Sequence, residues 1–253
     1  MSLRAGPVTY RAPVEVTVVG FVAVAAVIVF GAIVQGTIGF GLGLLAAPLV
    51  AVAIPEAIPV VLVLVAWPIG GVTAAREFRS LERFALTWML IGAVPGTLIG
   101  LWIIQLASAP TLGVIVGAST LAGVLATLVS PPIPVNRTTA CGAGLIGNIT
   151  GTAASVGGPP VALLFQHHRG PVIRSTLGVY FVVSATLSVI GYAATGEITF
   201  ARVLLALTLI PAMLGGAWLS RYFHRFVDAG WLRPSVLALS GVAGSIAILR
   251  GVL

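Results

Sequence analysis

The chain has 253 residues, of which 58% are hydrophobic and only 8% are charged. A soluble domain carries about a quarter charged residues, so this composition excludes an ordinary water-soluble fold and predicts a polytopic membrane protein. The net charge is +7, and all 13 basic residues are arginine. Because most of these arginines fall in short loops between apolar segments, we interpret them as determinants of membrane orientation and expect no nucleic-acid partner.

Ten apolar segments follow one another, separated by charge, proline and glycine. The first set comprises 14–34, 42–54, 57–75, 84–106 and 111–129, and the second comprises 138–154, 159–166, 172–194, 200–219 and 232–249. Segments near 20 residues fit a hydrocarbon core of about 30 Å, whereas 42–54 and 159–166 are too short to cross alone. Segment 14–34 is too long for the apolar core of a signal peptide and is predicted to be a retained span.

The two sets resemble copies of one another, because glycine, proline and aromatic residues recur in order at nearly constant offsets. The matched pairs are Gly39/Gly151, Pro48/Pro160, Pro59/Pro171, Phe84/Phe200, Pro95/Pro211, Gly100/Gly216 and Trp102/Trp218. We therefore predict an all-α polytopic membrane protein with two homologous repeats, 1–130 and 131–253. Each repeat would hold a short helix pair broken at glycine and proline, followed by three spanning helices.

The arginine distribution favours inverted over parallel repeats. If the first two segments of each half form a hairpin that enters and leaves on one side, the halves are inverted. Placing loop 76–83 in the cytoplasm then puts Arg76, Arg79, Arg83, Arg137, Arg169, Arg174, Arg221, Arg225 and Arg233 inside, and Arg4, Arg11, Arg202 and Arg250 outside. The positive-inside rule prefers this arrangement. Arg4 and Arg11 oppose it, so the orientation of the N-terminus stays open.

Two stretches rich in glycine and small polar residues interrupt the apolar pattern, at 36–41 and at 147–160. Non-helical backbone inside a membrane is tolerated only where it is buried in protein or lines a cavity. Glycines let backbone N–H groups approach a ligand, and prolines suit the first turn of a helix, whose free N–H groups favour anions. We expect each stretch to break a helix near the middle of the membrane and to face the other across a small anion. Tight helix packing is the alternative role for these small residues.

The predicted substrate-binding residues come from both breaks, and they include hydroxyl groups and the amide of Asn148 as donors. They are Gln35, Gly36, Thr37, Gly39, Gly41 and Pro48 in the first half, and Asn148, Thr150, Gly151, Thr152, Ser155, Gly157, Gly158, Pro159 and Pro160 in the second.

Four further residues are candidates for proton coupling or for a vestibule, namely Glu56, His167, His168 and Arg174. Intramembrane acids and histidines can carry protons, although an interfacial position is the plainer interpretation of each. Adjacent histidines point to different faces of a helix and no further ligands lie at metal-binding spacing, so no metal site is expected. No nucleophile–base pair, phosphate-binding loop or dinucleotide fingerprint occurs, and we expect neither a cofactor nor an enzymatic activity.

The two glycine-rich motifs, "QGTIGFGLGLLAAPL" at 35–49 and "GNITGTAASVGGPPVALL" at 147–164, resemble those of the sulfite exporter TauE/SafE family, also called the toluene-sulfonate uptake permeases. The resemblance extends from about residue 27 to the C-terminus. It implies transport of small sulfur-containing anions such as sulfite, sulfonates or sulfoacetate, with the two motifs at the transport site.

Together, these features predict a secondary transporter that moves a small organosulfur or related anion by alternating access. An anion channel and a non-transporting structural subunit of a membrane complex remain alternatives. The expected location is the cell membrane, specifically a bacterial inner membrane, with multiple passes. The expected partners are the anion, the lipid bilayer, a coupling proton or other ion, and a second copy in a homodimer.

Overall fold

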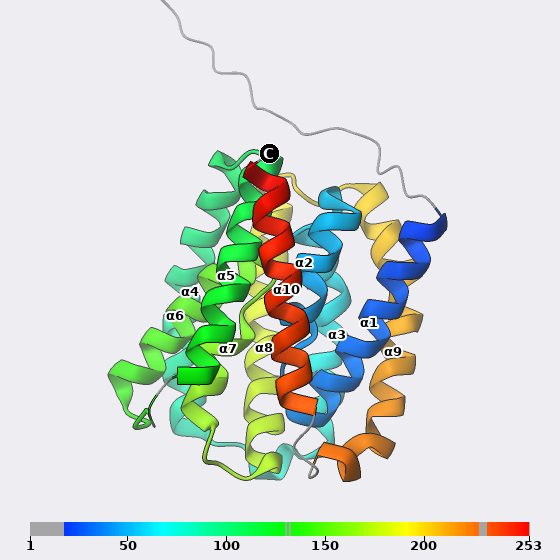
Figure 1. Ribbon diagram of the computed structural model, residues 1–253. Helices are drawn as coiled ribbons and strands as arrows, with labels where there is room; N and C mark the ends of the chain where they lie inside the picture. Colours follow the sequence, from blue (N-terminus) through cyan, green and yellow to red (C-terminus); the bar gives the residue numbers. More distant parts are fainter. Residues whose placement is uncertain (1–17, 130, 132, 228–231, 253) are drawn as a thin grey trace, which may run out of the picture.

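The computed structural model describes residues 18–129, 131, 133–227 and 232–252, apart from the side chains of residues 56, 224–227 and 232–234. In these ranges the chain forms ten α-helices and three short 3₁₀ turns (Figure 1). The α-helices are α1 (Val18–Ile38), α2 (Leu42–Ala53), α3 (Val60–Arg76), α4 (Arg83–Leu106), α5 (Ala109–Val129), α6 (Arg137–Ala154), α7 (Gly158–Ala162), α8 (Gly170–Ala194), α9 (Phe200–Val227) and α10 (Leu232–Val252), and the turns are η1 (Pro55–Ala57), η2 (Phe78–Ser80) and η3 (Leu163–Phe165).

Six helices are long and apolar enough to cross a bilayer, namely α1, α4, α5, α8, α9 and α10. Large apolar side chains cover the outward faces of these helices, for example Leu98 and Trp102 on α4 and Phe200 on α9. Lipid solvates such a surface, whereas water would not. The prediction of an all-helical, multi-pass membrane protein is therefore confirmed.

Two helices differ from the expected pattern of spans. The third segment of the first half forms α3 with only 17 residues, whereas its counterpart in the second half forms α8 with 25. Helix α6 has 18 residues and is much less apolar than α1, since it carries several threonines and Asn148. Neither α3 nor α6 is among the six candidate spans.

The short helices α2 and α7 lie inside the bundle. Helix α2 buries residues on every side, from Leu42 to Val50, and α7 with η3 buries an unbroken run from Val161 to Phe165. A helix that is apolar all round belongs in an interior. These segments therefore fill the core, although each is too short to cross a bilayer.

The longer helices pack around this interior in pairs (Figure 1). Helices α4 and α6 lie on one side, α1 and α9 on the other, and α5 lies beside α10, while α3 packs against α8. Glycines allow the close approaches: Gly92, Gly96 and Gly100 of α4 face the backbone of α6, and Gly36 and Gly216 lie between α1 and α9. Small residues at four-residue spacing are the usual means by which membrane helices approach.

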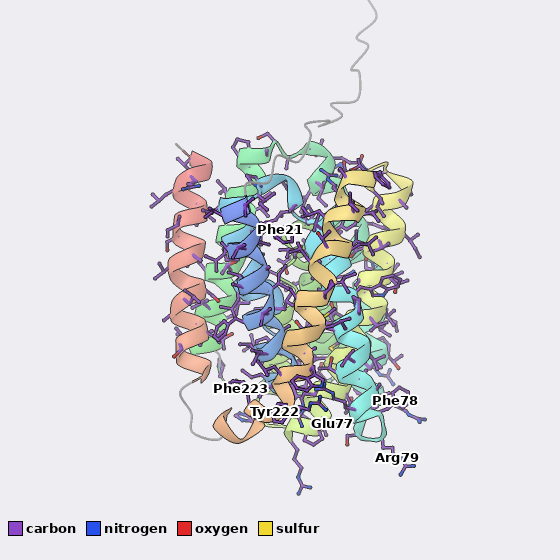
Figure 2. All side chains as sticks on the ribbon, turned by 90° about the vertical axis from the view of Figure 1, so that its right-hand side faces the viewer. Phe21, Glu77, Phe78, Arg79, Tyr222 and Phe223 are labelled. Carbon is purple, nitrogen blue, oxygen red and sulfur yellow. The ribbon has the colours of Figure 1, made fainter. Side chains whose placement is uncertain are left out.

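Polar caps fix the starts of two helices at the lower end of the bundle. Asn136 and Thr139 form a reciprocal capping box at the start of α6, with both hydrogen bonds at 3.0 Å. The carboxylate of Glu82 accepts a hydrogen bond from the Ala85 N–H at the start of α4. Figure 2 shows Glu77 and Arg79, from the link between α3 and α4, at the same end of the bundle as Tyr222 of α9.

Candidate functional site

The chain breaks in two places where the sequence predicts, but each break is shorter than expected. Helix α1 continues to Ile38, so Gly36 and Thr37 are helical, and the first break comprises residues 39–41. Helix α6 continues to Ala154, so residues 147–154 are helical, and the second break comprises residues 155–157. The glycine-rich sequence of α6 does not end the helix, because its small residues are used for packing. Gly147 and Gly151 face Gly157 of the second break, and the opposite side of α6 lies against Gly96 and Gly100 of α4.

Backbone geometry explains which residues stand at the breaks. Gly39 and Gly41 have φ angles of 105° and 127°, which side-chain-bearing residues rarely adopt. Ser155 ends α6 in the left-handed conformation with φ 59°, and its N–H donates to the carbonyl of Gly151. Thr150 stabilises this turn, since its hydroxyl donates to the carbonyl of Val156 at 2.9 Å.

The two breaks contact each other. A side-chain carbon at Gly43 would collide with the carbonyl oxygen of Ser155, so the first turn of α2 lies directly against the second break. A side-chain carbon at Gly158 would lie 3.2 Å from the ring of Phe40 in the first break. Residues more than 110 positions apart in sequence therefore meet at one place.

A cavity of about 70 Å³ lies at this junction. A single water molecule needs about 10–15 Å³ on a comparable measure, so the cavity can hold a solute of a few heavy atoms. Both breaks and one face each of α3 and α8 enclose it. Its lining comprises Gln35, Gly41, Leu42, Gly43, Leu44, Leu62, Val63, Ala66, Gly147, Asn148, Gly151, Ser155, Gly157, Gly158, Tyr180, Phe181, Ser184, Ala185 and Ser188.

Seven of the predicted substrate-binding residues line this cavity, namely Gln35, Gly41, Asn148, Gly151, Ser155, Gly157 and Gly158. The other eight do not, namely Gly36, Thr37, Gly39, Pro48, Thr150, Thr152, Pro159 and Pro160.

The residues outside the lining have contacts of other kinds. Gly36 faces Ser220 of α9, and the hydroxyl of Thr37 donates to the carbonyl of Ile33 within α1. Thr152 contacts a lining residue from outside the cavity, since its hydroxyl lies 2.8 Å from that of Ser188. Pro48 and Pro159 are buried, Pro160 is half-buried, and Gly39 lies against the backbone of Arg174.

The four predicted vestibule residues also lie away from the cavity. His167 and His168 are exposed in the link between η3 and α8, where the His168 ring packs edge-on against Phe165. Arg174 forms an ion pair with Glu77 and donates to the carbonyl of Thr37 at 3.2 Å. The side chain of Glu56 lies outside the described residues.

Two amide side chains in the lining have fixed orientations. The Oε1 atom of Gln35 accepts a hydrogen bond from the Leu42 N–H at 3.3 Å. The Nδ2 group of Asn148 donates to the carbonyl of Ala93 at 2.9 Å and to the hydroxyl oxygen of Thr97. The sequence predicts Asn148 as a donor to the anion, but both of its N–H groups are engaged by α4.

Sequence reasoning missed the contribution of α8. Tyr180, Ser184 and Ser188 line the cavity, and Tyr192 donates to the Thr152 carbonyl at 2.5 Å just beyond it. These four polar residues recur at every fourth position of α8 and therefore share one face. That spacing is a signal for a buried polar face that the sequence alone offers.

None of the described residues that line the cavity is acidic, basic or histidine. Within the described ranges, no group of three or more His, Cys, Asp or Glu side chains is placed to hold a metal ion. The arrangement offers neutral hydrogen bonds and helix ends to a small polar solute.

Fold and site together define a polytopic helical membrane protein that encloses a small polar cavity between two helix breaks. A model of the protein family described as Sulfite exporter TauE/SafE matches residues 23–246, a range that includes both breaks and the whole cavity lining. The chain belongs to this family, and it is accordingly a membrane transporter and not an enzyme. Comparison with curated proteins and with solved structures gave no match.

Proposed function

We propose that the protein is a secondary transporter of a small organosulfur or related anion, such as sulfite or a sulfonate, in a bacterial inner membrane. The anion binds in the cavity between the two breaks. The observation that carries this proposal is the position of the cavity: it lies where two helix breaks meet, in a chain whose family is named for sulfite export.

Backbone donors support an anionic substrate. The first N–H groups of a helix have no partner within the helix, and its N-terminal end carries a partial positive charge. Leu42, Gly43 and Leu44 form the first turn of α2 and line the cavity. The Leu42 N–H donates to Gln35 Oε1, so the N–H groups of Gly43 and Leu44 are the donors left for an anion. Substrate selection would then rest on oriented dipoles, without an arginine in the cavity.

Helix directions support two inverted repeats, with α1–α5 equivalent to α6–α10. The pair α4–α6 then corresponds to α9–α1, and both pairs pack closely. Helices α3 and α8 would be each other's counterparts, as would α5 and α10. A two-fold axis in the membrane plane requires such self-matched pairs to run antiparallel, whereas an axis along the membrane normal requires them to run parallel.

Glycine contacts give the directions of these self-matched pairs. Gly70 of α3 lies against Gly178 and Val182 of α8, while Gly178 lies against Gly70 and Ala74. Residue numbers therefore rise along α3 as they fall along α8, which is the pattern of antiparallel packing. Helices α5 and α10 also run in opposite directions in Figure 1. This geometry supports inversion of residues 1–130 relative to residues 131–253.

Alternating access follows from this arrangement. Transporters with inverted repeats bind substrate where the repeats meet and expose it to either side by rocking one part against the other. Here each half contributes one break to the cavity, so a relative movement of the halves would open it toward one side at a time. His167 and His168 are assigned to the vestibule because they are exposed at one end of the bundle.

Flux measurements in liposomes test the proposal. Protein reconstituted into proteoliposomes is loaded with unlabelled sulfite, and uptake of labelled sulfite is measured with and without the internal load. A carrier gives saturable uptake that the internal load accelerates. Uptake that does not saturate and is insensitive to the internal load indicates a channel, and no sulfite or sulfonate flux under either condition rejects the proposed function.

A further inference from the structure

The polar side chains of the cavity present hydrogen-bond acceptors more than donors, which is an unusual lining for an anion site. From this we infer that the transported anion carries its own O–H or N–H donor, which binds to the side-chain oxygen of Asn148. The inference rests on the proposed function and narrows its substrate class from small organosulfur anions to those that bear a donor, which include sulfite in its protonated form, hydrogensulfite.

The inference depends mainly on the hydrogen bonds of the Asn148 side chain. The residue is 2% exposed, and its two N–H groups donate to the carbonyl of Ala93 and to the hydroxyl oxygen of Thr97. Thr97 cannot reverse this bond, because its own hydrogen is donated to the Ala93 carbonyl at 2.9 Å. The amide is therefore held in one orientation, with its oxygen left for the cavity.

No hydrogen bond within the described residues engages Asn148 Oδ1. In the described part of the chain, Ser240 Oγ is the one fully buried polar side-chain atom without a partner. Asn148 Oδ1 therefore retains accessible surface, and the residue lines the cavity. An oxygen in this position can accept a hydrogen bond from a ligand but can give none to an anion.

The hydroxyl groups around the cavity also present acceptors to it and not donors. Tyr180 donates to the Gly144 carbonyl at 3.2 Å, Ser155 to the Pro59 carbonyl at 3.1 Å, and Ser188 to the Ser184 carbonyl at 3.0 Å. Each hydrogen is thus directed to another protein group. The oxygens of Tyr180 and Ser155 keep lone pairs for the cavity, whereas Ser188 Oγ also accepts from the Thr152 hydroxyl at 2.8 Å.

Gln35 offers a hydrogen-bond donor, whereas Asn148 offers an acceptor. This residue is 5% exposed, and its Oε1 atom is held by the Leu42 N–H. Its Nε2 group, which has no hydrogen bond within the described residues, is therefore a donor for the negative oxygens of the ligand. The cavity then has a donor side at Gln35 and the first turn of α2, and an acceptor side at Asn148.

A ligand without a donor would leave a negatively charged oxygen facing the oxygen of Asn148. Burying an acceptor without a partner is unfavourable, and the loss of one such hydrogen bond corresponds to about tenfold in affinity. Discrimination of this kind comes from the unpaired polar group that the wrong ligand leaves behind.

Two sulfonates of equal size and charge provide the test. 2-Hydroxyethanesulfonate carries a hydroxyl group where propanesulfonate carries a methyl group. Binding to the purified full-length protein is measured by calorimetry or by the shift in melting temperature. We expect 2-hydroxyethanesulfonate to bind at least about tenfold more tightly. Asn148→Leu should bring the two ligands to equal affinity, whereas Gly142→Ala on the same helix should preserve the difference.

Three results overturn the inference. Equal affinity of the wild-type protein for both sulfonates removes the donor requirement while leaving the anion site intact. Tight binding of propanesulfonate in sodium but not in choline buffer assigns the acceptor side to a bound cation instead. An absence of binding for sulfite and for both sulfonates rejects the proposed anion site itself.

Discussion

Arg174 and Glu77 lie 97 residues apart in the sequence and form a bidentate ion pair. The Nε–Oε2 distance is 2.9 Å and the Nη2–Oε1 distance is 2.5 Å. The third guanidinium nitrogen donates to the carbonyl of Thr37, in the last turn of α1, where the helix end is partly negative. One side chain thereby connects the start of α8, the link between α3 and α4, and the end of α1 just before the first break.

A double-mutant cycle should detect this connection. Arg174→Gln and Glu77→Gln should each lower the melting temperature, and the double variant should lose less than the sum of the two. The side chains are only 16% and 26% exposed, so we expect a coupling free energy of about 1 kcal/mol. Arg174→Lys should not restore it fully, because an ammonium group cannot form the paired bonds. Strictly additive effects would show that the pair contributes nothing.

Two glycines of α6 provide a matched test of the packing between α4 and α6. A side chain at Gly144 would overlap the backbone of Met89, whereas one at Gly142 would meet nothing within 4 Å. Gly144→Ala should destabilise the protein by about 1–3 kcal/mol, and Gly142→Ala should be neutral or stabilising by up to about 1 kcal/mol. Equal melting temperatures for the two variants would contradict the close approach of these helices.

Ser155 allows backbone strain to be separated from hydrogen bonding. Ser155→Ala and Ser155→Gly both lose the bond to the Pro59 carbonyl, but only glycine adopts the left-handed conformation without penalty. Ser155→Gly should therefore be more stable than Ser155→Ala by about 1 kcal/mol. Thermal unfolding in detergent measures the difference. If the alanine variant were the more stable one, the second break would not have this geometry.

Cysteine labelling in whole cells tests the topology. In a Cys141→Ser background, cysteines at Arg79 and Arg169 should react from the same side of the membrane. Both residues are exposed, and the links that hold them, between α3 and α4 and between η3 and α8, lie at the lower end of the bundle in Figure 1. Cysteines at Ser108 and Thr195 should react from the opposite side. Labelling of Arg79 and Arg169 positions from different sides would exclude this arrangement of helices.

The sequence predicted where the two helix breaks lie and that they contact each other, but it predicted longer breaks than the structure has. Glycine and proline in an apolar chain identify where helices end, but the same glycines also permit packing, and only the three-dimensional partner decides between these roles. Residues 147–154 stayed helical because α4 lies against them. The sequence predicted Arg174 as a vestibule or interfacial residue. Its ion pair with Glu77 could not be predicted, because the two residues are remote in sequence.

The chemistry of the cavity was harder to predict than its location. The orientation of the Asn148 amide depends on Ala93 and Thr97, and no local pattern connects these residues. The polar face of α8 was readable in principle from the spacing of Tyr180, Ser184 and Ser188. Its relevance depended on knowing that α8 borders the two breaks.

The central claim is that the cavity between the breaks holds the transported anion, and Gly158→Leu tests it most directly. Gly158 lines the cavity, and a side chain there would extend toward Phe40 and fill the space between the breaks. Sulfite uptake into proteoliposomes is measured beside the melting temperature, with Gly142→Ala as the control. We predict that the Gly158→Leu protein inserts and folds but loses sulfite uptake, while the control transports normally. Wild-type uptake by a folded Gly158→Leu protein would contradict the claim.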